Sequence, residues 1–283
     1  MPVLNGINLV GNTLAIMFLR ETQHGIRENF RLALDMAERE AASFARRLFF
    51  EYGRATIDTW RLRSDAFVPQ ITTLDEDARV LARSRRNGRG FLLATGHVGN
   101  WEMGAVTLRS HKLTSAVVGQ PELDPNVQQM RLSLRKRLGV ESIDIGSSMA
   151  TAFRVRAAVD AGRAVALLVD RAYPEDRVMV PFFGRPTPFL RSPALLARFC
   201  DCDVLPGFFL RAPDGSYFNV WGEPLAADRS RSPEEDARRI MGRVASDLEA
   251  VIRRFPTQWF NFYRFWKGEV DSRQSTVDSG GRR

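Results

Sequence analysis

Several residue types are scarce in this sequence, and each scarcity excludes a class of protein. Only two of the 283 residues are cysteines, Cys200 and Cys202. Two cysteines cannot form a disulfide framework, and the single residue between them is too short a spacing for the usual zinc sites. We therefore expect two small apolar residues at the end of a buried segment. Because the chain has only three histidines, a histidine-rich metal site is not expected either.

A long uninterrupted apolar run is also missing. The best candidate for a membrane-spanning segment is residues 3–19, which is about as long as the shortest spanning helices and is diluted by Asn5, Asn8 and Asn12. It lacks the basic start and the small-residue cleavage site of a signal peptide. Two interpretations stay open: a segment that lies on or dips into a membrane surface, and a plain buried helix.

Lysine is the third scarce residue type. The formal net charge is +8, with 41 basic and 33 acidic residues, but only Lys112, Lys136 and Lys267 are lysines, so that 38 are arginines. The planar fork of arginine suits phosphate and carboxylate groups. Nucleic acid, membrane phospholipid and a phosphorylated substrate are all open as partners. Nucleic acid is the weakest of the three, because the arginines are scattered beside acids and no nucleic-acid-binding motif occurs.

The rest of the composition is that of an ordinary globular protein. With 44% hydrophobic and 26% charged residues, a wholly disordered chain is excluded. The length fits one large domain or two small ones, and no repeat or linker divides the middle of the chain. We expect an apolar, membrane-associating segment at 1–26, a single α/β domain at 27–267 and a disordered polar tail at 268–283.

Hydrophobic periodicity predicts the secondary structure. Apolar residues recur at steps of four and three through residues 27–62, which is typical of a long helix or a helix pair. From residue 88 short apolar runs (91–94, 115–118, 164–169, 204–210 and 217–221) alternate with helical patterns (about 101–110, 124–138, 148–161, 190–200 and 233–254). This alternation predicts an α/β fold whose mostly parallel central sheet is covered by helices.

The stretch most informative about chemistry is GHVGNWE, residues 96–102, between a predicted strand and a predicted helix. Ligands bind beyond the carboxyl ends of the strands in open α/β sheets. His97 is suited to take a proton near neutral pH, and Glu102 in the first helical turn can fold back onto its ring. Without a serine or cysteine nucleophile beside them, the pair predicts activation of a substrate hydroxyl. The alternative is that His97 caps the turn and Glu102 is a solvated acid.

The chain resembles a known family at this stretch and at further blocks in the same order. GHVGNWE is similar to the H-x4-D/E block of the bacterial lipid A biosynthesis (lauroyl/myristoyl) acyltransferases and the related phosphatidylinositol mannoside acyltransferases. The other blocks are REN (27–29), LRKRLG (134–139), AGRAVALLVDR (161–171), VPFFG (180–184) with Thr187, and PTQWFNFYRFW (256–266). One departure is Ser192, where the family usually has glycine; we expect it to narrow or reshape the acceptor pocket.

The resemblance implies a glycerolipid acyltransferase-like αβα sandwich with an N-terminal helical region, and a membrane-associated O-acyltransferase activity. A fatty acyl chain would pass from an acyl carrier protein or coenzyme A thioester to a hydroxyl of a lipid A precursor-like lipid, with no resident cofactor or metal. His97 would be the general base and Glu102 its orienting carboxylate. Backbone N–H groups near 96–100, or an arginine, would hold the oxyanion. The substrate-binding residues implied by the blocks are Asn100, Arg135, Asp170, Arg171, Phe183 and Gly184.

Alternatives stay open within this resemblance. The acceptor could instead be a phosphatidylinositol mannoside, a lysophospholipid or an aminolipid, or the chain could be a non-catalytic lipid-binding member. We expect a peripheral or monotopic protein at the cytoplasmic face of the bacterial inner membrane. The aromatic run at 259–266 suits a membrane interface, with packing against the sheet as the equal competitor.

Overall fold

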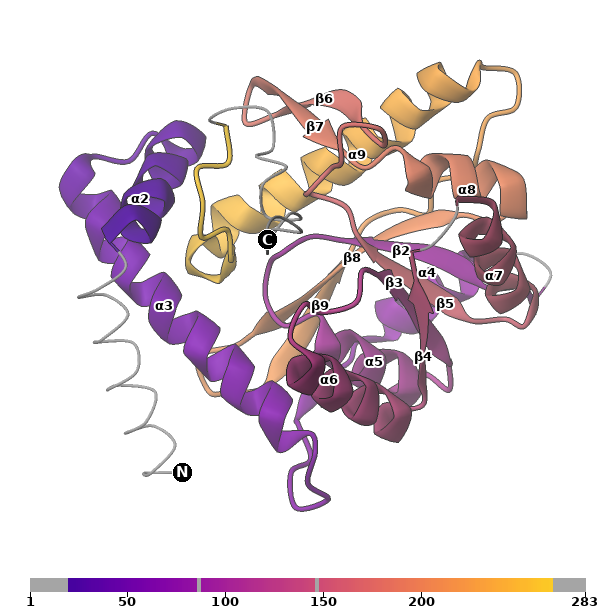
Figure 1. Ribbon diagram of the computed structural model, residues 1–283, viewed down its shortest axis with the longest axis horizontal. Coiled ribbons are helices and arrows are strands. Elements are labelled where there is room, and N and C mark those ends of the chain that lie inside the picture. Colours follow the sequence, from indigo (N-terminus) through magenta and orange to yellow (C-terminus); the bar gives the residue numbers. More distant parts are fainter. Residues whose placement is uncertain (1–19, 86–87, 146–147, 267–283) are drawn as a thin grey trace, which may run out of the picture.

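The computed structural model describes residues 20–85, 88–145 and 148–266 (Figure 1). The apolar run at 3–19 and the polar tail at 268–283 lie outside the described residues, so their expected roles stay predictions. Within the described ranges, no helix combines the length and the apolar character needed to cross a membrane.

A seven-stranded sheet forms the centre of the molecule. Its strand order is β1-β9-β8-β2-β5-β3-β4, and every neighbouring pair is parallel except β8 with β9. The strands are β1 Ile71–Thr72, β2 Phe91–Thr95, β3 Ser115–Gly119, β4 Val140–Asp144, β5 Ala164–Leu168, β8 Val204–Arg211 and β9 Tyr217–Trp221. A separate antiparallel hairpin is formed by β6 Val178–Phe182 and β7 Arg185–Phe189.

Helices cover both faces of this sheet. They are α2 Arg20–Leu34, α3 Glu38–Arg61, α4 Asp75–Arg83, α5 Glu102–Ser110, α6 Pro125–Leu138, α7 Ser148–Asp160, α8 Ser192–Cys200 and α9 Pro233–Arg254, followed by a 3-10 turn at Pro256–Gln258. In Figure 1, α2 and α3 lie together at one side of the molecule, and α9 runs beside the β6–β7 hairpin.

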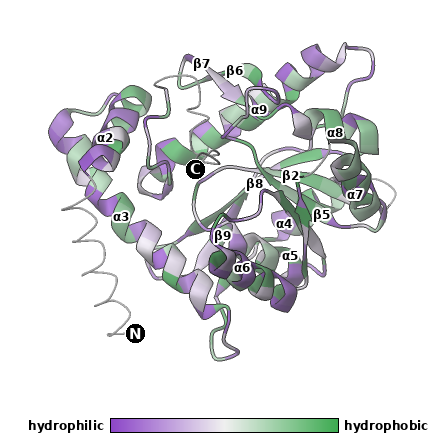
Figure 2. Ribbon diagram, viewed as in Figure 1, coloured by the Kyte–Doolittle hydropathy of each residue, from purple (hydrophilic) through white to green (hydrophobic). Residues whose placement is uncertain are grey.

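Alternate side chains of β2 pack against helices on opposite faces of the sheet. Leu92 and Ala94 belong to the core cluster that contains buried residues of α7, α8 and α9. Phe91 and Leu93 belong to a second cluster with buried residues of α4 and α5. Because successive side chains of a strand point to opposite faces, β2 is apolar on both sides, as a central parallel strand should be. Figure 2 shows the same pattern, with the central strands green between helices of mixed hydropathy.

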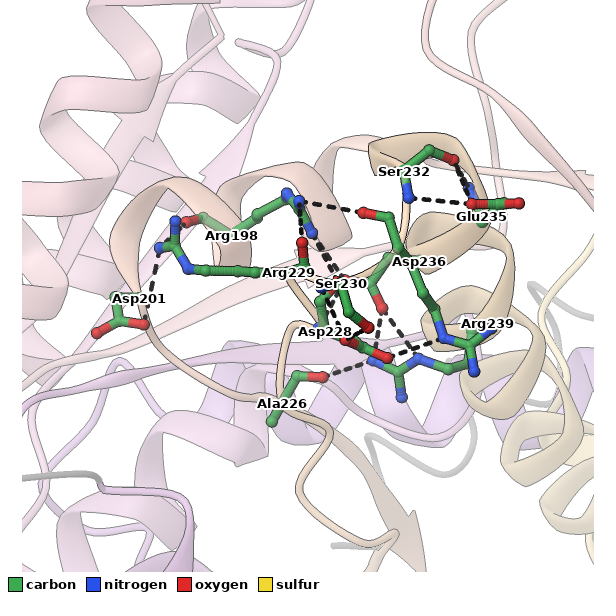
Figure 3. A network of polar contacts seen from close by, with 11 residues as sticks. Arg198, Asp201, Ala226, Asp228, Arg229, Ser230, Ser232, Glu235, Asp236 and Arg239 are labelled. Atoms are coloured by element: carbon green, nitrogen blue, oxygen red, sulfur yellow. Dashed lines mark hydrogen bonds and ion pairs between the residues drawn. The ribbon is translucent and has the colours of Figure 1, made fainter.

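The start of α9 is fixed by polar contacts (Figure 3). Ser232 caps the helix and forms a reciprocal capping box with Glu235, and Pro233 occupies the first helical turn. The buried carboxylate of Asp236 accepts a hydrogen bond of 2.6 Å from Arg239 and lies 3.7 Å from Arg198 of α8. These contacts tie α9 to α8 on one face of the sheet.

Most predicted elements are confirmed within a few residues. The 27–62 pattern is a helix pair, and the five predicted strands and five predicted helices from residue 91 onward are all present. The structure adds β4, the β6–β7 hairpin and α4, which the periodicity did not predict. Both cysteines are buried and free, as expected.

The expected boundary after residue 26 falls inside a helix. Residues 20–26 belong to α2, where Ile26 is fully buried in the main core. A Cβ on Gly25 would come within 3.1 Å of the backbone of Tyr263 and Arg264, so this turn of α2 packs directly on the C-terminal segment. The start of α2 is therefore part of the α/β domain's packing.

Candidate active site

Strand register brings His97 and Asp170 together. β2 and β5 are parallel, with Thr95 opposite Leu168, so that the residues two positions beyond each strand end meet at the same edge of the sheet. The Nδ1 atom of His97 lies 2.6 Å from Oδ1 of Asp170, and the backbone N–H of His97 donates to Oδ2 at 3.0 Å. The Asp170 side chain is fully buried, whereas the His97 side chain is 14% exposed.

The charge of Asp170 fixes the tautomer of His97. Burial alone raises the pKa of Asp170, but the electrostatic attraction and hydrogen bonds of His97, together with the charge of Arg171, outweigh it and lower the pKa to about 2. An ionised carboxylate can only accept, so Nδ1 of the ring carries the proton. In the neutral ring Nε2 is therefore an unprotonated acceptor, which is the state that a general base needs.

The loop that carries His97 is clamped by its neighbours. The N–H groups of Gly99 and Asn100 each donate at 2.8 Å, to the carbonyls of Gln258 and Phe209 respectively. Gly99 has a φ of 64°, and a Cβ there would lie 2.0 Å from the Phe209 carbonyl oxygen. Only glycine fits this close approach of two backbones. The sequence GHVGN thus builds a rigid support for the histidine.

This clamping narrows one expectation about the oxyanion. The N–H groups of His97, Gly99 and Asn100 are already donated to protein acceptors, so these backbone groups are not free to bind a developing charge. The other expected donor is an arginine. Arg135 lines the same cavity as His97, and its Nε atom is buried without a hydrogen-bond partner in the described part of the chain.

The expected pairing of His97 with Glu102 is also corrected. Glu102 is the first residue of α5 and lies 3.4 Å from Arg135, with both side chains about nine-tenths buried. Asp170 occupies the position beside the ring that Glu102 was expected to fill. The reason is topological: the end of β5 is adjacent to the end of β2, whereas the clamped turn at 98–101 directs α5 toward α6.

A large cavity opens in front of the histidine. It measures about 820 Å³ and is lined by apolar side chains of several elements, among them Leu108 of α5, Val117 of β3 and Phe209 of β8. Its polar lining includes His97, Glu102, Arg135 and Arg171. Trp101 also lines it and packs edge-on against the His97 ring, with 5.5 Å between the ring centres. The cavity is thus mostly apolar, and His97, a candidate proton acceptor, lies in its wall.

The other predicted binding residues fall into two groups. Arg171 lines the cavity, but its guanidinium also donates to the Phe260 carbonyl at 3.2 Å and to the Asn261 side chain at 3.3 Å. Asn100 is buried and donates to the Ala55 carbonyl at 3.1 Å. Both residues therefore hold the walls of the site together, in addition to any contact with a ligand.

Phe183 and Gly184 are not brought to either of the two cavities described around this loop. They form the turn of the β6–β7 hairpin, with φ values of 51° and 72° that suit a tight two-residue turn. The Phe183 N–H donates to Glu249 of α9 at 2.6 Å, and its ring packs against Trp259. The expectation that these two residues wall the site is not supported by this placement. Ser192, in contrast, lines the large cavity at the start of α8.

Sequence reasoning missed one polar cluster beneath the loop. The buried carboxylate of Asp58 accepts hydrogen bonds from Tyr217 at 2.9 Å and from Arg211 at 3.0 Å. Tyr217 in turn accepts a hydrogen bond of 3.4 Å from the Asn100 amide. An acid in the apolar stripe of α3 was the available signal, since charged residues are rarely buried without partners.

Comparison with known proteins identifies the family of this site. Residues 4–268 match the family described as bacterial lipid A biosynthesis acyltransferases. The chain belongs to this family. This member is therefore an acyltransferase of lipid biosynthesis, as the sequence blocks indicated.

Curated relatives of this acyltransferase carry a more specific name. This chain is 25% identical over 245 residues to the phosphatidylinositol mannoside acyltransferase of Mycolicibacterium smegmatis, and the match covers 86% of this chain and 76% of the relative. It is 30% identical over 194 residues to the protein of the same name from Mycobacterium tuberculosis, covering 68% of this chain and 60% of the relative. Among solved structures, the 1-acyl-sn-glycerophosphate acyltransferase of Thermotoga maritima is similar at 14% identity, with a TM-score of 0.42 and coverage of 92% and 97% of the two chains.

Proposed function

We propose that this acyltransferase moves a fatty acyl chain from a thioester donor, an acyl carrier protein or coenzyme A, to a sugar hydroxyl of a glycolipid. The single observation that carries this proposal is the His97–Asp170 pair beside a large, mostly apolar cavity. The pair supplies a base for a hydroxyl, and the cavity supplies space for an acyl chain. This assignment replaces the expected His97–Glu102 pair with His97–Asp170.

The chemistry follows from the free Nε2 atom of His97. It takes the proton of the acceptor hydroxyl while the oxygen attacks the thioester carbonyl carbon and forms the new C–O bond. The ionised Asp170, with its lowered pKa, stabilises the imidazolium that results. When the tetrahedral intermediate collapses, the C–S bond breaks and the imidazolium returns its proton to the leaving thiolate. The products are an ester and a free thiol, and the histidine ends in its starting state.

Arg135 is the residue proposed to stabilise the oxyanion. Its side chain is only 12% exposed and lies against Glu102 and Ser142, so its position is fixed before substrate binds. A fixed cation in a partly desolvated site stabilises developing negative charge without reorganisation. Glu102 is then a positioning residue that holds Arg135, instead of a partner of the histidine.

Exposed apolar side chains support attachment to a membrane surface near the cavity. Met149 and Phe153 of α7 are 63% and 57% exposed, and Phe153 stacks edge-on against Phe199 of α8. Ile145, also exposed, lines the large cavity. Basic side chains adjoin this patch, since Arg156 lies over the Phe199 ring. An exposed apolar patch of this kind suits attachment to a lipid surface.

The relatives guide the choice of acceptor. Both named relatives are phosphatidylinositol mannoside acyltransferases, whereas the family as a whole is named for lipid A biosynthesis. The assay therefore offers the protein palmitoyl coenzyme A or palmitoyl carrier protein together with either a phosphatidylinositol mannoside or a lipid A precursor. Mass spectrometry identifies the acylated lipid. Acyl transfer by the wild type and its loss in His97→Ala supports the proposal; transfer retained in His97→Ala would overturn it.

A further inference from the structure

A second, smaller cavity lies between α3 and α6. It measures about 210 Å³ and is lined by residues of both helices and by the loop Gly99, Asn100, Trp101 and Glu102. This cavity differs in chemistry from the large one. Its lining includes two threonines, two tryptophans and two arginines, whereas the lining of the large cavity also contains many aliphatic side chains, among them Leu108 and Val117.

One face of α3 and the turn after it supply three of the polar side chains of this cavity. Thr56 and Trp60 are four residues apart on α3, so they share a helix face, and Arg63 lies in the turn that follows the end of this helix at Arg61. The Thr56 hydroxyl, the Trp60 indole N–H and the Arg63 guanidinium have no hydrogen-bond or ion-pair partner in the described ranges of the chain. Trp60 is 56% exposed, which is unusual for so large an apolar surface. The face thus offers unsatisfied donors beside an open aromatic ring.

The two cavities are contiguous. Tyr52, Trp101, Glu102, Arg131 and Phe260 line both of them. Trp101 contacts the His97 ring edge-on, so it forms part of the wall between the small cavity and the proposed base. The small cavity therefore adjoins the cavity that His97 lines.

We propose that the α3–α6 cavity binds the polar headgroup of the acceptor, a phosphorylated sugar or polyol. The inference rests on the proposed acyl transfer and adds where the acceptor binds. Hydroxyl and indole donors match sugar oxygens, exposed aromatic faces accept the apolar faces of a sugar ring, and the Arg63 fork matches a phosphate. The acyl chain of the donor then occupies the large cavity, and the two substrates meet at His97.

The test separates acceptor binding from chemistry. Thr56→Val, Trp60→Ala and Arg63→Ala are compared with the wild type in palmitoyl transfer from coenzyme A to a phosphatidylinositol dimannoside and, in a second arm, to a phosphorylated lipid A precursor. We expect Trp60→Ala and Arg63→Ala each to raise the KM for the acceptor by about tenfold while kcat and the donor KM change by less than about twofold. Hydrolysis of the donor by water, measured without acceptor, should stay at the wild-type rate.

A matched control for Arg63→Ala comes from α3. Arg39 of α3 is exposed and lines neither cavity, so Arg39→Ala makes the same change of charge and should leave the acceptor KM unchanged. Binding of the water-soluble deacylated headgroup of phosphatidylinositol dimannoside, observed by ligand NMR, gives a readout independent of turnover. Arg63→Ala should abolish this binding and Arg39→Ala should retain it.

Two other outcomes would overturn the placement of the headgroup. Unchanged acceptor KM and headgroup binding in all three variants would overturn the placement of the headgroup while leaving the proposed function intact. A rise in the donor KM instead would assign this cavity to the phosphate arm of the donor and equally overturn the inference. Failure of the proposed function is distinct, because the wild type itself would then transfer no acyl chain.

Discussion

Two carboxylate contacts define the site at the scale of single residues. Asp170 holds the ring and the backbone N–H of His97, and Glu102 holds the guanidinium of Arg135. Both contacts are largely shielded from water, so each constrains the charged or polar group that faces the cavity. In the proposed mechanism, one carboxylate orients the base, and the other positions the cation that binds the oxyanion.

Double-mutant cycles test whether Glu102 is coupled to Arg135 or to His97. Loss of either partner leaves a buried charge unpaired, so Glu102→Gln and Arg135→Gln should each destabilise the protein by about 1–3 kcal/mol. The double variant should show a coupling energy of about 0.5–3 kcal/mol in urea unfolding. The control cycle of Glu102→Gln with His97→Gln should show coupling near zero. The reverse pattern would restore Glu102 as the partner of the histidine.

The low pKa of Asp170 makes the stability of the protein depend on pH. Its folded-state pKa of about 2 lies below the value of about 3.9 expected in the unfolded chain. A carboxyl group whose pKa is depressed by folding stabilises the protein fully above the unfolded pKa, and this contribution is lost as pH falls toward the folded pKa. The difference in unfolding free energy between wild type and Asp170→Asn should therefore shrink between pH 4.5 and pH 2.5. A difference that widens on acidification would contradict this account.

The residues of the site were predictable to different degrees. His97 stands out in the sequence because glycines and a predicted strand surround it. Its partner does not, since Asp170 is 73 positions away along the chain and only the register of β2 with β5 shows that the two strand ends are neighbours. The sequence alone therefore points to Glu102, which is close to His97 along the chain, whereas the carboxylate that is close in space is Asp170.

At the scale of elements, the C-terminal segment is held by α2 and by Arg171. The buried amide of Asn29 donates to the Tyr263 carbonyl at 2.7 Å, and its oxygen accepts from the Phe265 N–H at 2.8 Å. Trp259 and Phe260 are buried, so this part of the aromatic run packs into the core. The packing interpretation is thus the one that the structure supports for these two residues.

Removal of Asn29 tests this anchor. Asn29→Ala leaves the Phe265 N–H and the Tyr263 carbonyl without their side-chain partner, so we expect a loss of about 1–3 kcal/mol in unfolding free energy. Thermal or urea unfolding measures it. Asn126→Ala is a suitable control, because the Asn126 side chain makes no contact of this kind within the described ranges and lies on the exposed start of α6. Equal stability of the two variants would show that the anchor contributes nothing.

The elements themselves were predictable where the hydrophobic pattern was strong. β2, β5 and β8 are nearly continuous apolar runs, and α9 combines a capping box with a long apolar stripe. β4 was missed because the sequence VESID alternates over only five residues and follows directly after a helix. The β6–β7 hairpin was missed because prolines interrupt both strands, and its turn contains Phe183 in a left-handed conformation that sequence does not predict.

At the scale of the whole molecule, the arginines fall into three groups. Many arginines are neutralised within the fold, as in the contacts of Arg198 and Arg239 with Asp236 (Figure 3). Arg156 lies over the Phe199 ring beside exposed apolar side chains of α7 and α8, and it also pairs with Asp160 at 3.7 Å. Residues such as Arg63 lie at a cavity and are proposed to serve the acceptor. The net charge of +8 is thus a sum over roles that composition alone does not separate.

The α7–α8 patch gives a prediction about membrane attachment. Met149→Ser with Phe153→Ser removes two exposed apolar groups without touching the buried core, so folding should be retained. We expect the fraction bound to vesicles containing anionic phospholipid to fall by about threefold or more, because about 1 kcal/mol or more of apolar burial is lost. Val68→Ser, at another exposed apolar residue, is the control. Vesicle binding equal to that of the control variant would contradict the placement of this face on the membrane.

The most direct measurement of the central claim is single-turnover acyl transfer by the wild type, His97→Ala and Asp170→Asn, with thiol release and ester formation followed together. If Asp170 orients the base, Asp170→Asn should lower the rate by about 10²–10⁴-fold, close to the loss in His97→Ala, with acceptor and donor binding unchanged. The two losses should not add in the double variant, because the residues act as a unit. Near wild-type transfer by Asp170→Asn, or additive losses in the double variant, would contradict the account.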